Sequence, residues 1–192
     1  MPTLEPKPVR WTVAAFDRLT LLGAFDRQRV ELLAGRIVRM PPQLEPHVAA
    51  VHRSGRVVAA AFGPGFYVRT QAPLRLGKRS KPEPDVAVVP GSEADYVQSG
   101  PPTTALLVIE VSDTTLRHDR TRKAAVYARF GIADYWVLNL IDRQLEVHRR
   151  PVPDAANARR FRYEEIRVFG CDEAVSPLAM PQARVMVSDM LV

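Results

Sequence analysis

Short apolar runs set the hydrophobic pattern of this chain and predict strands. Residues 85–89 form a β-branched run bounded by Pro84 and Pro90, and residues 105–111 form a second run closed by Ser112. Both are short enough to be core strands. Apolar runs or alternation predict further strands at residues 66–76, 135–138, 145–148 and 161–169.

Apolar residues three and four positions apart predict helices. Thr12 can cap a helix that runs to about Leu22, and residues 47–62 form a second helix after a loop at 41–46. A third helix covers residues 119–130 and ends before Gly131. A hairpin with its turn near Gly35 follows the first helix, and polar loops are expected at residues 90–104 and 151–160.

The runs at 85–89 and 105–111 bring two carboxylates together. The segment between them holds no second apolar period, so the simplest connection is antiparallel. Asp85 starts the first strand and Glu110 nearly ends the second, so the two meet at one edge of the sheet. Alternation places Glu110 on the same face as Val108 and Leu106, where apolar side chains are expected.

Two carboxylates in a poorly hydrated pocket repel each other unless one is protonated or a cation lies between them. An oxygen-only site with open positions suits Mg²⁺ or Mn²⁺. Asp85 and Glu110 are therefore candidate ligands of such an ion.

Lys123 lies on the apolar side of the third helix, between Tyr127 and Phe130. In one interpretation its stem covers the core and its ammonium reaches water. In the other, the ammonium extends over the sheet edge toward Asp85 and Glu110, where it could hold a phosphate or orient an attacking water. The pattern leaves both open.

Composition is typical of one soluble domain with an anionic partner. The chain has 192 residues, 46% of them hydrophobic, and carries a net charge of +6 with a pI near 9.9. We expect a flexible, Pro-rich arm at residues 1–10 and a single domain at 11–192. The basic residues Lys78, Arg79 and Lys81 either contact phosphates or form a solvated hairpin tip.

Several other classes of site are disfavoured. Cys171 is the only cysteine, which excludes an intrachain disulfide and fits a reducing cytoplasm. His47 and His52 are five residues apart and do not share a helix face, so a histidine zinc site is not expected. No Gly-x-Ser-x-Gly motif accompanies Ser112, and no apolar window of membrane-spanning length occurs.

A set of motifs occurs in a characteristic order and spacing. The motifs are VELLAGRIVRM at residues 30–40, His47, Pro84-Asp85-Val86, Ile109-Glu110-Val111-Ser112, Asp119 with Lys123 and Tyr127, and GIADYW at residues 131–136. Together they resemble the Uma-two family of the restriction-endonuclease-like PD-(D/E)XK nuclease superfamily. The resemblance runs from Trp11 to about Arg149 and resumes at Ser176.

The resemblance implies an α/β (α+β) fold with a mixed central β-sheet flanked by helices, an N-terminal helix and a β-hairpin. It implies a metal-dependent endonuclease that cleaves nucleic acid, with DNA the expected substrate, by in-line attack of a metal-activated water. Asp85 and Glu110 would be metal ligands, Lys123 a catalytic cation and Glu31 an acid that completes the site. The usual superfamily lysine, two residues after the glutamate, is replaced by Ser112, and Lys123 takes its role.

The resemblance also suggests that His47 approaches the phosphate near a helix N-terminus. An alternative function is a catalytically silent module of the same fold that binds nucleic acid or protein. A homodimer is compatible with either function.

Overall fold

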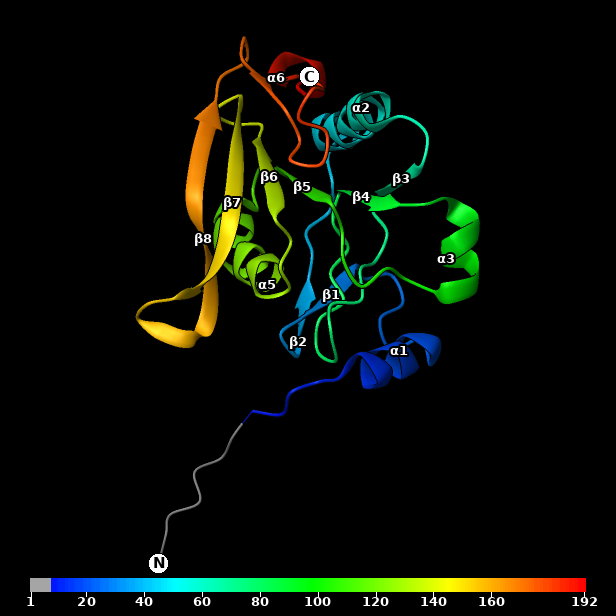
Figure 1. The fold of residues 1–192 in the computed structure, drawn as a ribbon. Coiled ribbons are helices and arrows are strands. Elements are labelled where there is room, and N and C mark those ends of the chain that lie inside the picture. The colour runs from blue at the N-terminus through cyan, green and yellow to red at the C-terminus, as the bar shows by residue number, and fades with distance from the viewer. Residues whose placement is uncertain (1–7) are drawn as a thin grey trace, which may run out of the picture.

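A six-stranded mixed sheet forms the centre of the protein, whose computed structural model describes residues 8–192 (Figure 1). Its strands lie in the order β3-β4-β5-β6-β7-β8. Their bounds are β3 Phe66–Thr70, β4 Val86–Pro90, β5 Leu107–Ser112, β6 Asp134–Asn139, β7 Gln144–Asp154 and β8 Asn157–Phe169. The mixed α/β architecture predicted from the sequence is confirmed.

The strand directions follow from the connections. β4 and β5 are antiparallel with Val86 opposite Ile109, as the polar segment between them predicts. β5 and β6 are parallel, because a helical segment carries the chain back across one face of the sheet. The remaining neighbours in the six-stranded sheet are antiparallel.

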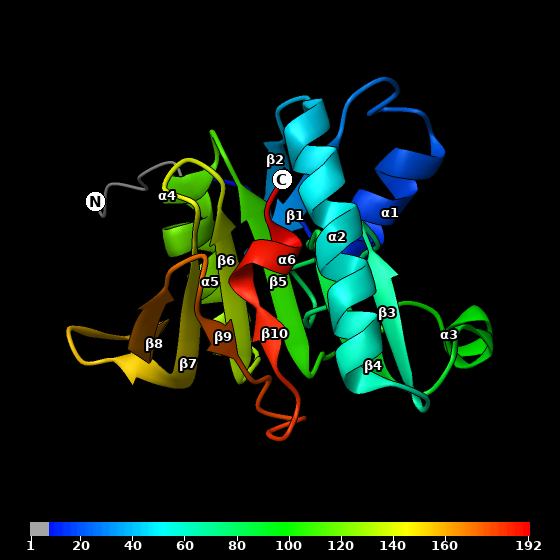
Figure 2. The same cartoon turned by 90° about the horizontal axis from the view of Figure 1, so that it is seen from above.

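Each face of the sheet is covered by a different helix. Helix α2 (Glu45–Phe62) and the short α6 (Val187–Met190) lie across one face, and α5 (Ala124–Arg129) lies on the other (Figure 2). Ile109 and Trp136 belong to the core on the α2 side, whereas Val108 and Tyr135 belong to the core on the α5 side. This alternation directs the side chain of Glu110 toward α5.

The N-terminal helix and hairpin lie beside the sheet, as predicted. Thr12 caps α1 (Val13–Leu21) by accepting a hydrogen bond from the Ala15 amide. Strands β1 (Val30–Leu33) and β2 (Arg36–Arg39) form the hairpin. Its turn places Ala34 and Gly35 at positive φ, as a type I′ turn requires. Leu32 packs with Val13 and Phe16 in a small separate core.

The helical segment between β5 and β6 contains a π-turn. It comprises α4 (Leu116–His118), the π-helix η1 (Asp119–Lys123) and α5. The Ala124 amide donates to the Asp119 carbonyl five residues earlier. A π-turn adds one residue to a helix and changes the direction of the side chains that follow it. The helix predicted at residues 119–130 is therefore present, with an irregularity that apolar spacing did not reveal.

Three further elements differ from the sequence prediction. β3 ends at Thr70 instead of residue 76, because Pro73 and the positive φ of Gln71 interrupt the strand. Helix α3 (Glu93–Ser99) occupies part of the segment predicted as loop, and its capping box joins Ser92 and Asp95. β7 and β8 extend into the predicted loop at 151–160.

The C-terminal part of the chain forms a small antiparallel pair, β9 (Ala174–Val175) and β10 (Val185–Met186), beside α6. Residues 1–7 of the predicted N-terminal arm lie outside the described residues. From residue 8 onward, no helix has the length and apolar character needed to cross a membrane.

Candidate active site

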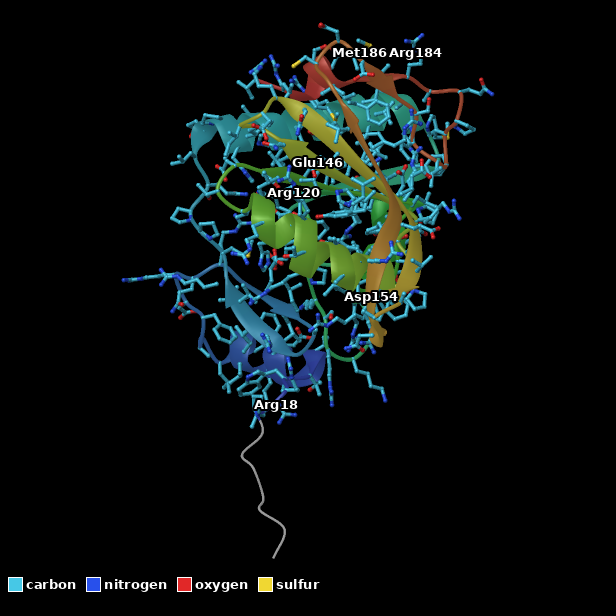
Figure 3. The ribbon with its side chains drawn as sticks, turned by 90° about the vertical axis from the view of Figure 1, so that its left-hand side faces the viewer. Arg18, Arg120, Glu146, Asp154, Arg184 and Met186 are labelled. Carbon is cyan, nitrogen blue, oxygen red and sulfur yellow. The ribbon has the colours of Figure 1, made fainter. Side chains whose placement is uncertain are left out.

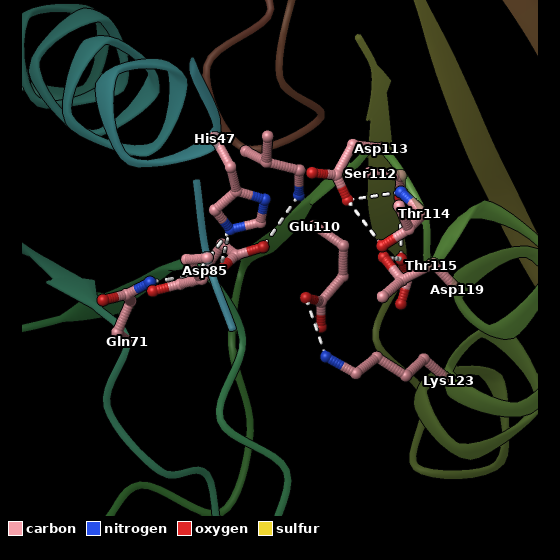
Figure 4. A network of polar contacts seen from close by, with 12 residues as sticks. His47, Gln71, Asp85, Glu110, Ser112, Asp113, Thr114, Thr115, Asp119 and Lys123 are labelled. Carbon is pink, nitrogen blue, oxygen red and sulfur yellow. Dashed lines mark hydrogen bonds and ion pairs between the residues drawn. The ribbon is translucent and has the colours of Figure 1, made fainter. Parts of the chain in front are cut away.

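Asp85 is fixed at the start of β4 by hydrogen bonds from both sides. The antiparallel register of β4 and β5 places it beside Val111, whose amide donates to Asp85 Oδ2 at 2.9 Å. The side chain of Gln71 lies 3.5 Å from Oδ1, and His47 Nε2 lies 3.3 Å from the same oxygen. These contacts orient the carboxylate toward the neighbouring Glu110 (Figure 4).

Glu110 contacts two side chains from the helical segment. Lys123 Nζ donates to Oε2 at 2.9 Å, and the Tyr127 hydroxyl donates to Oε1 at 2.6 Å. Lys123 and Tyr127 are four residues apart, so both lie on the helix face that covers β5. The ammonium of Lys123 therefore points inward, as in the second of the two interpretations that the sequence left open.

Glu31 joins the site from the β1–β2 hairpin. Lys123 Nζ lies 3.2 Å from Glu31 Oε1, so a single ammonium links a hairpin carboxylate to a sheet carboxylate. Glu31, Glu110 and Lys123 are each only 2% exposed. The structure thus brings together Asp85, Glu110, Lys123 and Glu31, the four residues that the sequence predicted as catalytic.

A small cavity of about 30 Å³ lies between these side chains. This volume can hold about two water molecules. The exposed residues Arg29, Pro41 and Pro42 lie at its border, so the cavity opens to solvent. Its acidic lining residues outnumber its lysine and arginine residues and are Glu31, Glu83, Asp85, Glu110, Asp113 and Asp119.

Burial and the neighbouring charges shift the pKa values of the acids in opposite directions. Burial raises the pKa of Glu110 well above its ordinary value, although Lys123 opposes the change. Burial would also raise the pKa of Asp85, but the contacts of its carboxylate with His47, Lys123 and the Val111 amide outweigh this effect and lower the pKa. Asp85 is thus the more readily ionised of the two.

The same surroundings raise the pKa of Lys123. Burial would lower it, but the carboxylates of Glu110, Glu31, Asp119 and Asp85 together raise it above its ordinary value. The pKa of Glu31 is raised by burial, against the influence of Lys123. Lys123 is therefore a permanent positive charge among acids that a bound cation would help to ionise.

Comparison with known proteins assigns the family. The model of the Uma2 family, described as "Putative restriction endonuclease", matches residues 13–187. This chain belongs to the Uma2 family. The match includes the four predicted catalytic residues and every residue that lines the acidic cavity.

Solved structures share the Uma2 fold. One is the crystal structure of "a putative nuclease belonging to DUF820" from Anabaena variabilis, which aligns with a TM-score of 0.67 and 16% sequence identity. The alignment covers 95% of this Uma2 chain and 97% of the Anabaena chain. No curated protein matches the sequence.

The donor set of the Uma2 cavity fits a hard divalent cation, because its acidic ligands are carboxylate oxygens. The buried oxygen Oε2 of Glu31 has no hydrogen-bond partner. Throughout residues 8–192, however, no three Asp, Glu, His or Cys side chains are arranged as a complete metal-binding group. The Lys123 ammonium occupies the position between Glu31 and Glu110 and draws both carboxylates toward itself.

Asp119 is a site residue that the sequence analysis did not assign. Its Oδ2 accepts hydrogen bonds from Ser112 at 2.7 Å and Thr115 at 2.6 Å, and its buried Oδ1 has no partner. Ser112 occupies the usual superfamily lysine position and here binds this acid. The sequence motif includes Asp119, but no local pattern predicts that its carboxylate pairs with Ser112.

The residues predicted to bind nucleic acid do not form one group. His47 lines the acidic cavity, whereas Lys78 and Arg79 line a separate groove. Lys81 forms a salt bridge with Asp17 at 2.6 Å. Its charge is partly neutralised, which leaves Lys78 and Arg79 as the more available pair.

Proposed function

We propose that this Uma2 protein is a divalent-metal-dependent endonuclease that hydrolyses phosphodiester bonds in nucleic acid, with DNA the expected substrate. One observation carries the proposal. The carboxylates of Asp85, Glu110 and Glu31 and the ammonium of Lys123 converge on one small cavity that opens to solvent. Family membership and the nuclease-like fold support the same reaction class.

Asp85 and Glu110 would hold the metal, Mg²⁺ or Mn²⁺, and Glu31 would complete the site. A bound divalent cation would supply Lewis-acid stabilisation of the phosphate charge and would lower the pKa of water. Asp85 is the best prepared ligand, since its pKa is lowered and its carboxylate is oriented by the Val111 amide. Glu110 would hold the metal beside the Lys123 ammonium, which donates a hydrogen bond to its Oε2.

Lys123 contributes a fixed positive charge to the reaction. Its ammonium can donate a hydrogen bond to a phosphate oxygen or to the attacking water while it remains paired with Glu110 or Glu31. Tyr127 holds the other oxygen of Glu110 and so limits rotation of that carboxylate. Because the cavity is small, the bases of a bound nucleic acid would remain outside it.

Nucleic acid is the proposed partner. The net charge of +6 favours a polyanion, and Lys78, Arg79 and His47 are the proposed contacts to phosphates. Lys81 is assigned a smaller share because of its salt bridge with Asp17. Assembly as a homodimer and a cytoplasmic location stay predictions.

The direct test is cleavage of plasmid and single-stranded DNA by purified protein with Mg²⁺ or Mn²⁺. Asp85→Asn and Glu110→Gln should each lower the cleavage rate about 100-fold or more, because the loss of a metal ligand removes several kcal/mol of transition-state stabilisation. EDTA should abolish cleavage by the wild-type protein.

Glu164→Gln is the matched control. Glu164 is an exposed acid on β8 that pairs with Arg150, so its substitution should leave the rate unchanged. Cleavage that survives both Asp85→Asn and Glu110→Gln would refute the site. Absence of cleavage in every condition would favour a silent binding module of the same fold.

A further inference from the structure

A second and larger depression lies beside the acidic cavity. It is a groove of about 780 Å³ between the β1–β2 hairpin, the loop at residues 77–80, helix α5 and strand β8. Figure 3 shows α5 beside the strands β7 and β8, with the β1–β2 hairpin below it. The basic residues that line the groove are Arg10, Arg36, Lys78, Arg79, Arg122, Arg129 and Arg160.

The charge of this basic groove is not balanced locally. No acidic residue lines it, and within residues 8–192 none of its seven basic residues forms a salt bridge. Seven cations that form no salt bridge and face no lining acid predict a polyanionic ligand.

Aromatic and aliphatic side chains complete the lining. Phe130 and Phe161 both border the groove and are partly buried. The Phe130 ring packs closely against Gly77, since a Cβ at Gly77 would lie 2.8 Å from Cε1 of the ring. Partly buried aromatic rings among arginines are the combination that binds unpaired bases and their phosphates in single-stranded nucleic acid.

We propose that the basic groove binds single-stranded nucleic acid, with phosphates on its arginines and bases against Phe130 and Phe161. An acidic peptide would use the cations but would gain little from the aromatic rings. A duplex keeps its bases stacked inside, where recessed rings cannot reach them. The volume is in the range of sites that enclose a compact ligand, such as a short stretch of unpaired strand.

The groove and the acidic cavity share their walls. Arg122 lines the groove and its neighbour Lys123 lines the cavity; on the hairpin, Leu33 lines the groove and Glu31 the cavity. The Lys123–Glu31 ion pair joins the two walls between the depressions. The next inference rests on the proposed function. The backbone of a nucleic-acid strand bound in the groove would continue into the cavity, so the nuclease would cleave unpaired segments.

Binding in EDTA tests the groove without any cleavage. The probes are a fluorescently labelled single-stranded oligonucleotide and its duplex, titrated with protein and followed by anisotropy at several salt concentrations. Arg122→Ala with Arg129→Ala should weaken single-strand binding about 10-fold or more. The same double variant should reduce the slope of log K against log salt by about 1.4, since each lost phosphate contact contributes about 0.7.

Phe161→Ala tests stacking separately from charge. It should weaken single-strand binding about 5-fold or more, with an unchanged salt slope. Arg56→Ala with Arg184→Ala is the matched control, because both arginines are exposed and neither lines the groove. The control should retain wild-type affinity, and circular dichroism should show all variants folded.

Equal weakening by the groove and control variants would overturn the proposal, and so would tighter binding of the duplex through the same arginines. If the groove variants weaken binding but the wild-type protein cleaves nothing in Mg²⁺, the groove proposal stands. That result would count only against the proposed nuclease activity. Cleavage with unaltered binding by the groove variants would uphold the nuclease and refute the groove.

Discussion

At the residue scale, periodicity predicts the position of Lys123 on its helix but not the direction of its ammonium. Helical periodicity places it on the apolar side of its helix, where a snorkelling and an inward position are both allowed. The inward ammonium pairs with Glu110 and also with Glu31, which is far away in sequence and approaches Lys123 only in the folded chain. Long-range pairings of this kind leave no local pattern.

Replacement of Lys123 by methionine should destabilise the protein. Glu31 and Glu110 would remain buried without their cation, which typically costs about 3–5 kcal/mol. Urea unfolding at pH 7 measures the change in the free energy of unfolding. Lys78→Met, at an exposed position, should change it by less than about 0.5 kcal/mol. Equal losses in the two variants would contradict the buried ion pair.

Glu146 should make the free energy of unfolding decrease as the pH falls in the acid range. Burial would raise its pKa, but His148 and the bidentate contact with Arg120 lower the pKa to about 2 (Figure 3). Because the folded-state pKa is below the ordinary value of 4.5, the carboxylate stabilises the protein above pH 4.5, and this stabilisation is lost as the pH falls toward 2.

Chemical unfolding at a series of pH values measures this dependence. The free energy of unfolding of the wild-type protein should fall more steeply between pH 4.5 and 2 than that of Glu146→Gln. Parallel curves would show that Glu146 contributes nothing to the acid dependence.

At the scale of elements, most of the sheet and the helices could be predicted because each has a local signal. The Asp85 strand has β-branched residues between prolines, and Thr12 is a helix cap. The π-turn at Asp119 could not be predicted, because helical spacing does not reveal one extra residue. Helix α3 was missed because none of its residues is buried, so it lacks an apolar stripe.

The loop at residues 77–80 depends on a glycine at its contact with α5. Gly77 has φ +64° and its α-carbon faces Phe130, so alanine would cause both backbone strain and a steric clash. Gly100→Ala is a matched control, since Gly100 has φ +80° but open space around its α-carbon.

Both variants should lose about 1 kcal/mol of stability from the positive φ. Gly77→Ala should lose a further ~1–3 kcal/mol because its methyl group overpacks against Phe130. Thermal and urea unfolding provide the comparison. Equal losses would mean that the loop moves away from α5 without cost.

At the scale of the whole molecule, charge is divided between two neighbouring depressions. The cavity at Asp85 and Glu110 collects acids, and the groove at Arg122 and Arg129 collects cations. The sequence shows only a modest net charge of +6, which conceals this division. Its arrangement depends on the β1–β2 hairpin, which forms a wall of both depressions and approaches α5 only in the folded chain.

The location of a bound Mn²⁺ tests the nuclease proposal most directly. Crystals grown with MnCl₂ give anomalous scattering that identifies the ion independently of any activity. We predict a peak in the acidic cavity, with carboxylate oxygens of both Asp85 and Glu110 at about 2 Å. The assignment would be contradicted if crystals saturated with Mn²⁺ showed no anomalous peak in the cavity. Glu110 would then still be paired only to Lys123 and Tyr127.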